Sequence, residues 1–250
     1  MHDLAAGPEG ERATARGSGA AGVGYCFNWM LSTVPYTELL KERGPKWLHL
    51  YIFKERELVQ RSIELAEKAN QTAGDSGFSA IILTCDHPHN RVRDRMVPGF
   101  GQRWMDMDCS PEAMNRLFFP NQVAAGWSPF TRGEVLSGLR TSDEPPGGNN
   151  DPSLTWQAVE WVCSITSLPV VVKGILSPAD AVRAVKAGAS AIVVSNHGGR
   201  QFDAAPPAIE VLTWRLHGGC VAVAWRLHAG YTVYPPAIEV LPSTLQHRHT

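Results

Sequence analysis

Continuous apolar runs that alternate with helical segments constrain the fold of this chain more than any other feature. One helical segment has Ser177 as its expected N-cap, Pro178 as its first helical residue and Gly188 as its C-cap. The flanking runs are apolar at successive positions, which is typical of parallel strands buried on both faces of a sheet. We predict an α/β fold with strands at residues 46–53, 78–86, 168–174 and 189–199, and helices at residues 54–69, 153–166 and 177–188.

Polar residues gather where the predicted strands end. Thr84 and Asp86 close one strand, Lys173 closes another, and Ser195 and His197 follow a third. Ligand sites of closed (β/α)8 barrels and of open doubly wound sheets both lie at the carboxyl ends of their strands. We favour the (β/α)8 barrel, although the apolar spacing fits both architectures. No Gly-x-Gly-x-x-Gly motif follows a strand to indicate dinucleotide binding.

The composition excludes several classes of protein. The chain has 250 residues, with 23 Lys and Arg against 24 Asp and Glu, so we expect neither nucleic acid nor a membrane surface as partner. Its apolar runs are too short to span a bilayer, and its N-terminus lacks the apolar core of a secretory signal. The five cysteines lack Cys-x-x-Cys spacing, which favours an intracellular protein with reduced thiols, and we expect no metal site.

The strongest chemical signal is the segment SNHGGRQFD at residues 195–203. His197 carries the side chain most often used as a general base near neutral pH, and Arg200 could bind a carboxylate through two parallel hydrogen bonds. Gly198 would let the backbone approach a ligand closely, and Asp203 could orient the imidazole and stabilise its protonated form. A polar turn with a salt bridge would explain the same residues without any function.

Other candidates carry a weaker signal. Lys173 could be a fixed cation that faces an anionic ligand, or it could be solvated at a strand end. An arginine of the segment 89–95 could close over an acidic substrate, although most arginines in such a segment are solvated. Trp29 and Tyr51 are expected to be core aromatics when the sequence is considered alone.

A family resemblance rests on a long segment, residues 168–203, which reads LPVVVKGILSPADAVRAVKAGASAIVVSNHGGRQFD. Almost throughout, it resembles a signature region of the FMN-dependent α-hydroxy-acid oxidases and dehydrogenases, to which glycolate oxidase belongs. Residues 32–59 and 77–94 resemble earlier strands of that family in the same order, so the similarity runs from about residue 9 to residue 212. We assign residues 1–212 to part of a (β/α)8 barrel domain and residues 213–250 to an atypical tail.

The resemblance implies a reaction and a role for each candidate residue. The reaction is the oxidation of a small (S)-2-hydroxy acid to a 2-oxo acid, with FMN as cofactor and dioxygen as an acceptor that yields hydrogen peroxide. His197 would be the base, supported by Asp203, and Lys173 would stabilise negative charge on the reduced flavin. Substrate contacts would come from Arg200, Arg93, Tyr51 and Trp29, and flavin contacts from Lys173, Ser195, Thr84, His49 and Gly198.

The sequence also departs from the family pattern. His49 stands where the family usually has Gln, and GYCFN replaces a Ser-rich stretch before Trp29. The family's FMN-phosphate motifs, an Asp-Gly-Gly-x-Arg and a Gly-Arg pair, do not follow residue 212; instead, PPAIEVL and WRLH each occur twice between residues 206 and 241. We therefore expect an incomplete barrel that lacks the first strand and the last two.

Two hypotheses about function follow from the resemblance and the departures. The first is an FMN-dependent 2-hydroxy-acid oxidase, which could form a homo-oligomer. The second is a non-catalytic truncated isoform or fragment that cannot hold FMN. A peroxisomal location is implied by the resemblance, although the chain ends in HRHT rather than in a Ser-Lys-Leu signal.

Overall fold

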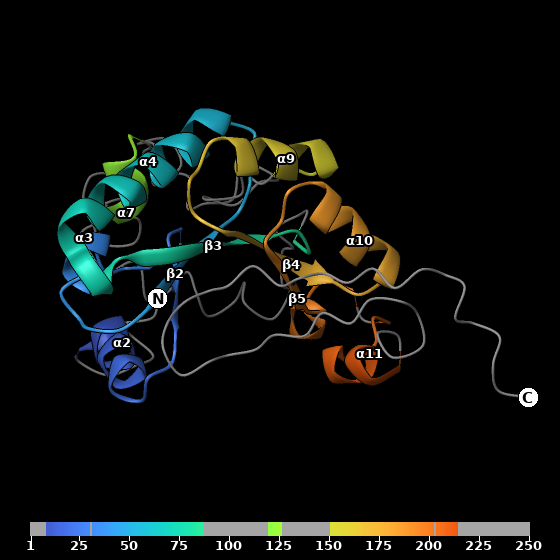
Figure 1. Cartoon of the computed structure of the whole chain (residues 1–250), viewed down its shortest axis with the longest axis horizontal. Coiled ribbons are helices and arrows are strands. Elements are labelled where there is room, and N and C mark those ends of the chain that lie inside the picture. The colour runs from blue at the N-terminus through green and yellow to red at the C-terminus, as the bar shows by residue number, and fades with distance from the viewer. Residues whose placement is uncertain (1–8, 31, 88–119, 127–150, 203, 215–250) are drawn as a thin grey trace, which may run out of the picture. The chain divides into compact units, whose positions relative to one another are not determined.

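A computed structural model describes residues 9–30, 32–87, 120–126, 151–202 and 204–214 of the chain (Figure 1). The chain divides into two compact units, the first made of residues 1–81 and 88–153 and the second of residues 82–87 and 154–250. Each unit is described by itself below. In the described part of the chain, no helix is both long enough and apolar enough to cross a membrane.

The first unit contains two short parallel strands and the start of a third. Strand β1 (Tyr25–Asn28) pairs in parallel with β2 (Lys46–Leu50), and residue 25 lies opposite residue 46. Strand β3 (Phe78–Thr84) begins in this unit and ends in the second. The helices are α2 (Gly10–Ala20), α3 (Tyr36–Leu39), α4 (Arg56–Ala73), the 3-10 turn η1 (Gly74–Ser76) and α7 (Pro120–Ala124).

The core of the first unit forms between the strands and one face of α4. Phe27 of β1 is fully buried and stacks on Phe78 at the start of β3, with ring centroids 5.9 Å apart. Helix α4 is amphipathic, because its buried residues recur at the spacing of helical turns, at positions 58, 59, 62, 63 and 66. The predicted helix at residues 54–69 is therefore confirmed in type and position.

The second unit is a compact α/β arrangement. It contains α9 (Trp156–Ser164), β4 (Val170–Ile175), α10 (Pro178–Lys186), β5 (Ala191–Val194), the 3-10 turn η2 (His197–Gly199) and α11 (Ala208–Trp214). Strands β4 and β5 pair in parallel, with a register shift between Lys173 and Ile175. Within this unit the strand order is the end of β3, then β4, then β5, so each strand neighbours the next one along the chain.

Helix α10 begins and ends where its sequence predicts. Ser177 is the N-cap, and its hydroxyl accepts a hydrogen bond from the backbone N–H of Asp180 at 3.1 Å, with Pro178 in the first turn. Gly188 adopts a positive φ of 94° just beyond the helix, a conformation that favours glycine. These signals fix the point at which β5 begins, and His197 follows the end of β5.

The boundaries of two other segments differ from the sequence prediction. Helix α4 continues through Ala73, four residues beyond the predicted end of the helix at residue 69. The reason is Asn70, whose amide accepts from the backbone N–H of Phe78 and donates to its carbonyl, both at 2.7 Å. Strand β1 is missing from the prediction, because its four residues are too few to show a pattern.

Lys46 is the largest exception to apolar burial in the first unit. Its side chain is almost fully buried at the start of β2. The Nζ atom donates to the backbone carbonyls of Glu42, Gly44 (3.0 Å) and Ser76 (3.3 Å). The ammonium therefore joins the loop between α3 and β2 to the turn η1 at one point.

We predict that Lys46→Met destabilises the protein by about 2–4 kcal/mol, because carbonyl oxygens that accept from a buried ammonium would lose their donor. Urea denaturation measures the change. Lys41→Met is the matched control, since Lys41 is exposed and pairs with Glu38 on the surface, and we expect it to change stability by less than about 0.5 kcal/mol. Equal effects of the two substitutions would contradict the role given to Lys46.

Candidate active site

Three charged or titratable side chains meet at the carboxyl end of the sheet in the second unit. Asp86 follows β3, Lys173 lies near the end of β4, and His197 follows β5. The backbone N–H of Cys85 donates to the carbonyl of Lys173 at 2.9 Å, which carries Asp86 alongside the end of β4. Residues far apart in the sequence are thus brought together by neighbouring parallel strands, as the fold class predicts.

The carboxylate of Asp86 is the centre of this cluster. Lys173 Nζ lies 3.0 Å from both carboxylate oxygens, and His197 Nδ1 lies 2.7 Å from Oδ1. An ionised carboxylate can only accept hydrogen bonds, so the geometry assigns the proton of a neutral His197 to Nδ1. The other ring nitrogen, Nε2, then carries a lone pair that can accept a proton.

The cluster is largely shielded from solvent. The exposed fraction of the side chain is 8% for His197, 12% for Asp86 and 22% for Lys173. Burial alone would raise the pKa of Asp86, but the hydrogen bond from His197 and the positive charge of Lys173 lower that pKa below its usual value. Asp86 is therefore ionised at neutral pH.

Gly174 permits the close approach of Asp86 to β4. Its φ is 112°, which lies outside the range of ordinary side-chain-bearing residues. A Cβ atom at this position would lie 2.5 Å from Cβ of Asp86 and 2.9 Å from its backbone nitrogen. Only glycine therefore allows Lys173 and Asp86 to be neighbours in this geometry.

The turn that carries His197 has an unusual backbone. His197 has a φ of 57°, and Gly198 and Gly199 have φ values of 66° and 69°. The backbone N–H of His197 donates to the hydroxyl of Ser195 at 3.0 Å, and the side chain of Asn196 accepts from Gly198 at 3.0 Å. A non-glycine residue held in this region is typical of functional sites, where surrounding contacts compensate for backbone strain.

Arg200 directly follows Gly199 in the sequence, and it is exposed. Its guanidinium approaches Gly198 so closely that a Cβ there would lie 2.9 Å from Nη1. Arg200 forms no ion pair with any residue that the structure describes. A guanidinium without a carboxylate partner next to the His197 turn is chemically suited to bind an anionic ligand.

The other predicted site residues fall into three groups. Thr84, Ser195 and Gly198 belong to the second unit, where Thr84 is buried at the end of β3. Trp29, His49 and Tyr51 belong to the first unit. There Trp29 stacks on Tyr36 at 4.9 Å, and His49 contacts Tyr51 at 5.0 Å between ring centroids. Arg93 and Asp203 lie outside the described residues.

The contact of Asp86 with His197 was not predicted from the sequence. Support of His197 by Asp203 stays a prediction, whereas the structure shows Asp86 hydrogen-bonded to the imidazole. The available signal was its position close to the end of an apolar strand, which Lys173 and His197 share. Sequence alone does not say which of two carboxylates reaches the histidine.

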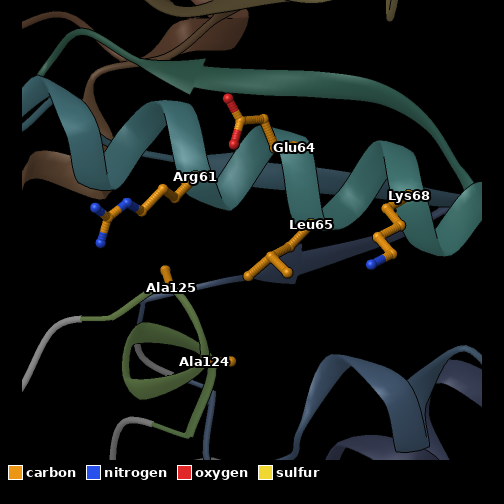
Figure 2. A pocket seen from close by; sticks show the side chains of 6 residues that line it. All are labelled: Arg61, Glu64, Leu65, Lys68, Ala124 and Ala125. Carbon is orange, nitrogen blue, oxygen red and sulfur yellow. The ribbon is translucent and has the colours of Figure 1, made fainter.

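The described residues form two cavities, and both lie away from the predicted site residues. One, of about 290 Å³, is lined by α4 residues and by Ala124 and Ala125 at and just beyond the end of α7, and Figure 2 shows Leu65 pointing from α4 towards Ala125. The other, of about 350 Å³, is lined by residues next to the start of β4 and β5, at the opposite end of the strands from His197. Neither lining includes a predicted site residue.

Comparison with known proteins identifies the family. A family model described as FMN-dependent dehydrogenase matches residues 1–216. The chain belongs to this family. The family resemblance given by residues 168–203 is thereby confirmed.

The chain is similar to several curated 2-hydroxyacid oxidases. It is 36% identical to the peroxisomal (S)-2-hydroxyacid oxidase GLO4 of Arabidopsis thaliana over 87% of this chain and 53% of that protein. It is 37% identical to 2-hydroxyacid oxidase 1 of Mus musculus over 82% and 50%, and 38% identical to 4-hydroxymandelate oxidase of Amycolatopsis orientalis over 85% and 54%. The chain thus spans about half the length of the curated relatives it matches.

Solved structures confirm the predicted fold class. A mandelate oxidase bound to 3,3-difluoro-2-hydroxy-3-phenylpropionic acid matches with a TM-score of 0.55 and 34% identity, over 85% of this chain and 50% of that one. A mutant of the active chimera of (S)-mandelate dehydrogenase matches with a TM-score of 0.59 and 28% identity, over 84% and 53%. The parallel α/β sheet therefore corresponds to half of a (β/α)8 barrel structure of this family.

The donor set at the strand ends fits the ring system of FMN. An isoalloxazine edge presents carbonyl oxygens and ring nitrogens, which require hydrogen-bond donors and a cation where negative charge develops. Thr84 and Ser195 offer hydroxyl groups and Lys173 offers an ammonium, all at the carboxyl ends of strands of one unit. These are the residues of the second unit that could hold the ring.

We predict that Gly174→Ala destabilises the protein by about 2–4 kcal/mol, because both backbone strain and a clash with Asp86 oppose it. Gly199→Ala is the matched control: Gly199 also has a positive φ, but a Cβ there meets no atom within 4 Å. Backbone strain alone should lower the free energy of unfolding of Gly199→Ala by about 1–2 kcal/mol, as measured by chemical denaturation. If Gly199→Ala destabilised the protein as much as Gly174→Ala, the clash with Asp86 would contribute nothing to the effect.

The lowered pKa of Asp86 predicts a pH dependence of stability. A carboxyl group whose folded pKa lies below its unfolded value stabilises the protein above the unfolded pKa of about 3.9, and this contribution is lost as pH falls through the folded pKa. Asp86→Asn should therefore cost about 1–3 kcal/mol at pH 7 and should flatten the decline of stability below about pH 5.

Urea denaturation across this pH range measures the effect of Asp86→Asn. Asp75→Asn is the control, because Asp75 is an exposed residue of η1. We expect the control to retain the wild-type pH dependence. A wild-type decline in the Asp86→Asn variant would refute the contribution of this carboxylate.

Proposed function

We propose that this chain catalyses the FMN-dependent oxidation of a small (S)-2-hydroxy acid to a 2-oxo acid, with dioxygen as acceptor and hydrogen peroxide as second product. The observation that carries the proposal is the 2.7 Å contact between His197 Nδ1 and Asp86 in a member of the FMN-dependent dehydrogenase family. Names of relatives such as 2-hydroxyacid oxidase 1 support the same substrate class.

His197 acts as the base in this proposal. Asp86 holds the proton on Nδ1, so the lone pair of Nε2 is available to accept a proton from the substrate. When His197 takes this proton, the new imidazolium lies beside an ionised carboxylate, which stabilises it. The left-handed backbone of the turn holds the ring in place before substrate arrives.

Arg200 binds the substrate carboxylate in this proposal. Its guanidinium is exposed, lies beside Gly198 and has no acidic partner among the described residues. A bidentate contact would fix the substrate with its hydroxyl-bearing carbon near His197. Arg93, Tyr51 and Trp29 are proposed as further substrate contacts on the strength of the family resemblance alone.

FMN, when bound, accepts the two electrons that leave the substrate. Lys173, Thr84 and Ser195 are proposed to hold its ring, with Gly198 and His49 as further contacts. Lys173 supplies a positive charge where the ring becomes negative, while its pairing with Asp86 keeps the ammonium at the strand end. Asp203 is proposed as a further support of His197.

The location of the protein is also a proposal. The relatives GLO4 and GLO3 of Arabidopsis thaliana are described as peroxisomal, and both are more than a third identical to this chain at 36% and 35%. We propose a peroxisomal location on this basis. Imaging of the tagged protein against a peroxisomal marker tests it.

We predict that His197→Ala lowers kcat/KM for a 2-hydroxy acid by about 10²–10⁴-fold, the usual contribution of a general base, while flavin absorbance of the purified protein is retained. Glycolate-dependent peroxide formation and the visible spectrum are the two measurements. Unchanged turnover would exclude His197 as the base.

The wild-type chain itself distinguishes the oxidase from the non-catalytic hypothesis. The purified protein is titrated with FMN, followed by flavin fluorescence, and then assayed with glycolate and dioxygen. We expect saturable FMN binding and formation of glyoxylate and hydrogen peroxide in equal amounts. A folded protein that binds no FMN and forms no peroxide would support the non-catalytic hypothesis instead.

A further inference from the structure

Asn196 directly precedes the proposed base and has no part in the mechanism above. Its side chain is half-buried in the second unit, and both ends of its amide form hydrogen bonds. Oδ1 accepts from the backbone N–H of Gly198 at 3.0 Å, and Nδ2 donates to the backbone carbonyl of Pro206 at 3.3 Å. These partners fix the orientation of the amide, since an N–H requires an acceptor and a carbonyl requires a donor. One side chain therefore joins the turn η2 to the segment that leads into α11.

The turn that Asn196 contacts has a backbone conformation that histidine rarely adopts. His197 has a φ of 57°, in the left-handed region where Cβ lies close to the following carbonyl oxygen. A return of φ to an ordinary value of about −60° would rotate Cβ by about 120° relative to the preceding strand. The imidazole would then leave the carboxylate of Asp86, from which its Nδ1 is now 2.7 Å away. The position of the base thus depends on the conformation of the turn.

Two successive side chains hold this turn. The hydroxyl of Ser195 accepts from the backbone N–H of His197 at 3.0 Å, and Asn196 accepts from the next N–H, that of Gly198. Gly198 is exposed and has a φ of 66°, but a glycine adopts negative φ values about as readily. Without Asn196, the N–H of Gly198 could bond to water in either conformation. Asn196 therefore opposes the easiest route by which the turn could relax.

The hydrogen bond to Pro206 fixes the amide of Asn196 itself. Pro206 lies two residues before α11, which packs against β5 and buries Val211. The carbonyl that accepts from Nδ2 thus belongs to a segment that is anchored outside the turn. This bond restricts the rotamers of Asn196, so that Oδ1 stays directed at Gly198.

We infer that Asn196 is a positioning residue of the proposed reaction: its amide holds the turn η2 in the conformation that places the imidazole of His197 on the carboxylate of Asp86. The inference rests on the proposed function, since it concerns the base of that reaction. Asn196 acts through His197 and requires no contact of its own with substrate or flavin.

Two substitutions separate the hydrogen bonds of Asn196 from its volume. Asn196→Leu keeps a side chain of similar size and loses both bonds, whereas Asn196→Asp keeps an acceptor for Gly198. The φ of Asn196 is −101°, so neither substitution adds backbone strain. We expect Asn196→Leu to lower kcat for a 2-hydroxy acid by about 10–100-fold with little change in KM, because a misplaced base slows the chemical step. Asn196→Asp should retain most of the activity.

The NMR signal of the His197 Nδ1 proton reports the same positioning without turnover. A proton held in a short hydrogen bond to a carboxylate and shielded from solvent exchanges slowly and resonates far downfield. Wild type and Asn196→Asp should show this signal, and Asn196→Leu should lose it. The signal is assigned by its absence in His197→Ala. If Asn196→Leu does not fold, Asn196→Ala removes the same bonds without added bulk and takes its place.

Asn70→Leu is the matched control, because the amide of Asn70 also bridges two backbone groups, the N–H and the carbonyl of Phe78 at the start of β3. We expect it to lower stability but to leave the His197 signal unchanged, together with kcat at a temperature where both proteins are folded.

A retained His197 signal in Asn196→Leu would overturn the inference, as would an equal loss of the signal in Asn196→Leu and in either Asn196→Asp or Asn70→Leu. The NMR comparison decides the inference even for a chain without oxidase activity. Its failure is therefore distinguishable from a failure of the proposed function.

Discussion

The carboxylate of Asp86 is the interaction on which the proposed site depends. Lys173 and His197 approach within 3.3 Å of each other, and a protonated histidine would face an ammonium at that distance without an intervening negative charge. The negative charge of Asp86 offsets the positive charges of both side chains, and these two side chains in turn keep Asp86 ionised. The charge state of the site is therefore a property of three side chains together, and no single pKa describes it.

This electrostatic arrangement rests on backbone features that have no charge. Gly174 gives Asp86 the space to lie against β4, and the hydrogen bond from Cys85 to Lys173 continues the alignment of the two strands. The left-handed turn at His197 directs the imidazole to the same carboxylate. The site is thus set by the ends of three neighbouring strands, which explains why such different residue types are gathered there.

Much of this arrangement could be predicted from the sequence, because long local patterns determine it. Apolar runs and the Ser177 cap fix the strands and helix of the second unit, and polar residues at the strand ends indicate where ligands bind. The partnership of Asp86 and His197 could not be predicted, since it joins residues 111 positions apart and competes with a nearer carboxylate, Asp203. The burial of Lys46 could not be predicted either, because its carbonyl partners lie both in the adjacent loop and on the turn η1, 30 residues away in the sequence.

The register shift in β4 allows one strand to contribute a side chain to the proposed site and another to the core. Lys173 pairs with Val193 and Ile175 pairs with Val194, so β4 has one residue more than β5 over this stretch. Neighbouring residues of a strand point to opposite sides, and cross-strand partners point to the same side. Lys173 and Ile175 therefore project to opposite sides of the sheet, although residues two apart in a regular strand would share one. The one inserted residue reverses the side of the sheet to which the following residue of β4 points. An ammonium and a buried aliphatic side chain are thereby accommodated on opposite sides within three consecutive positions.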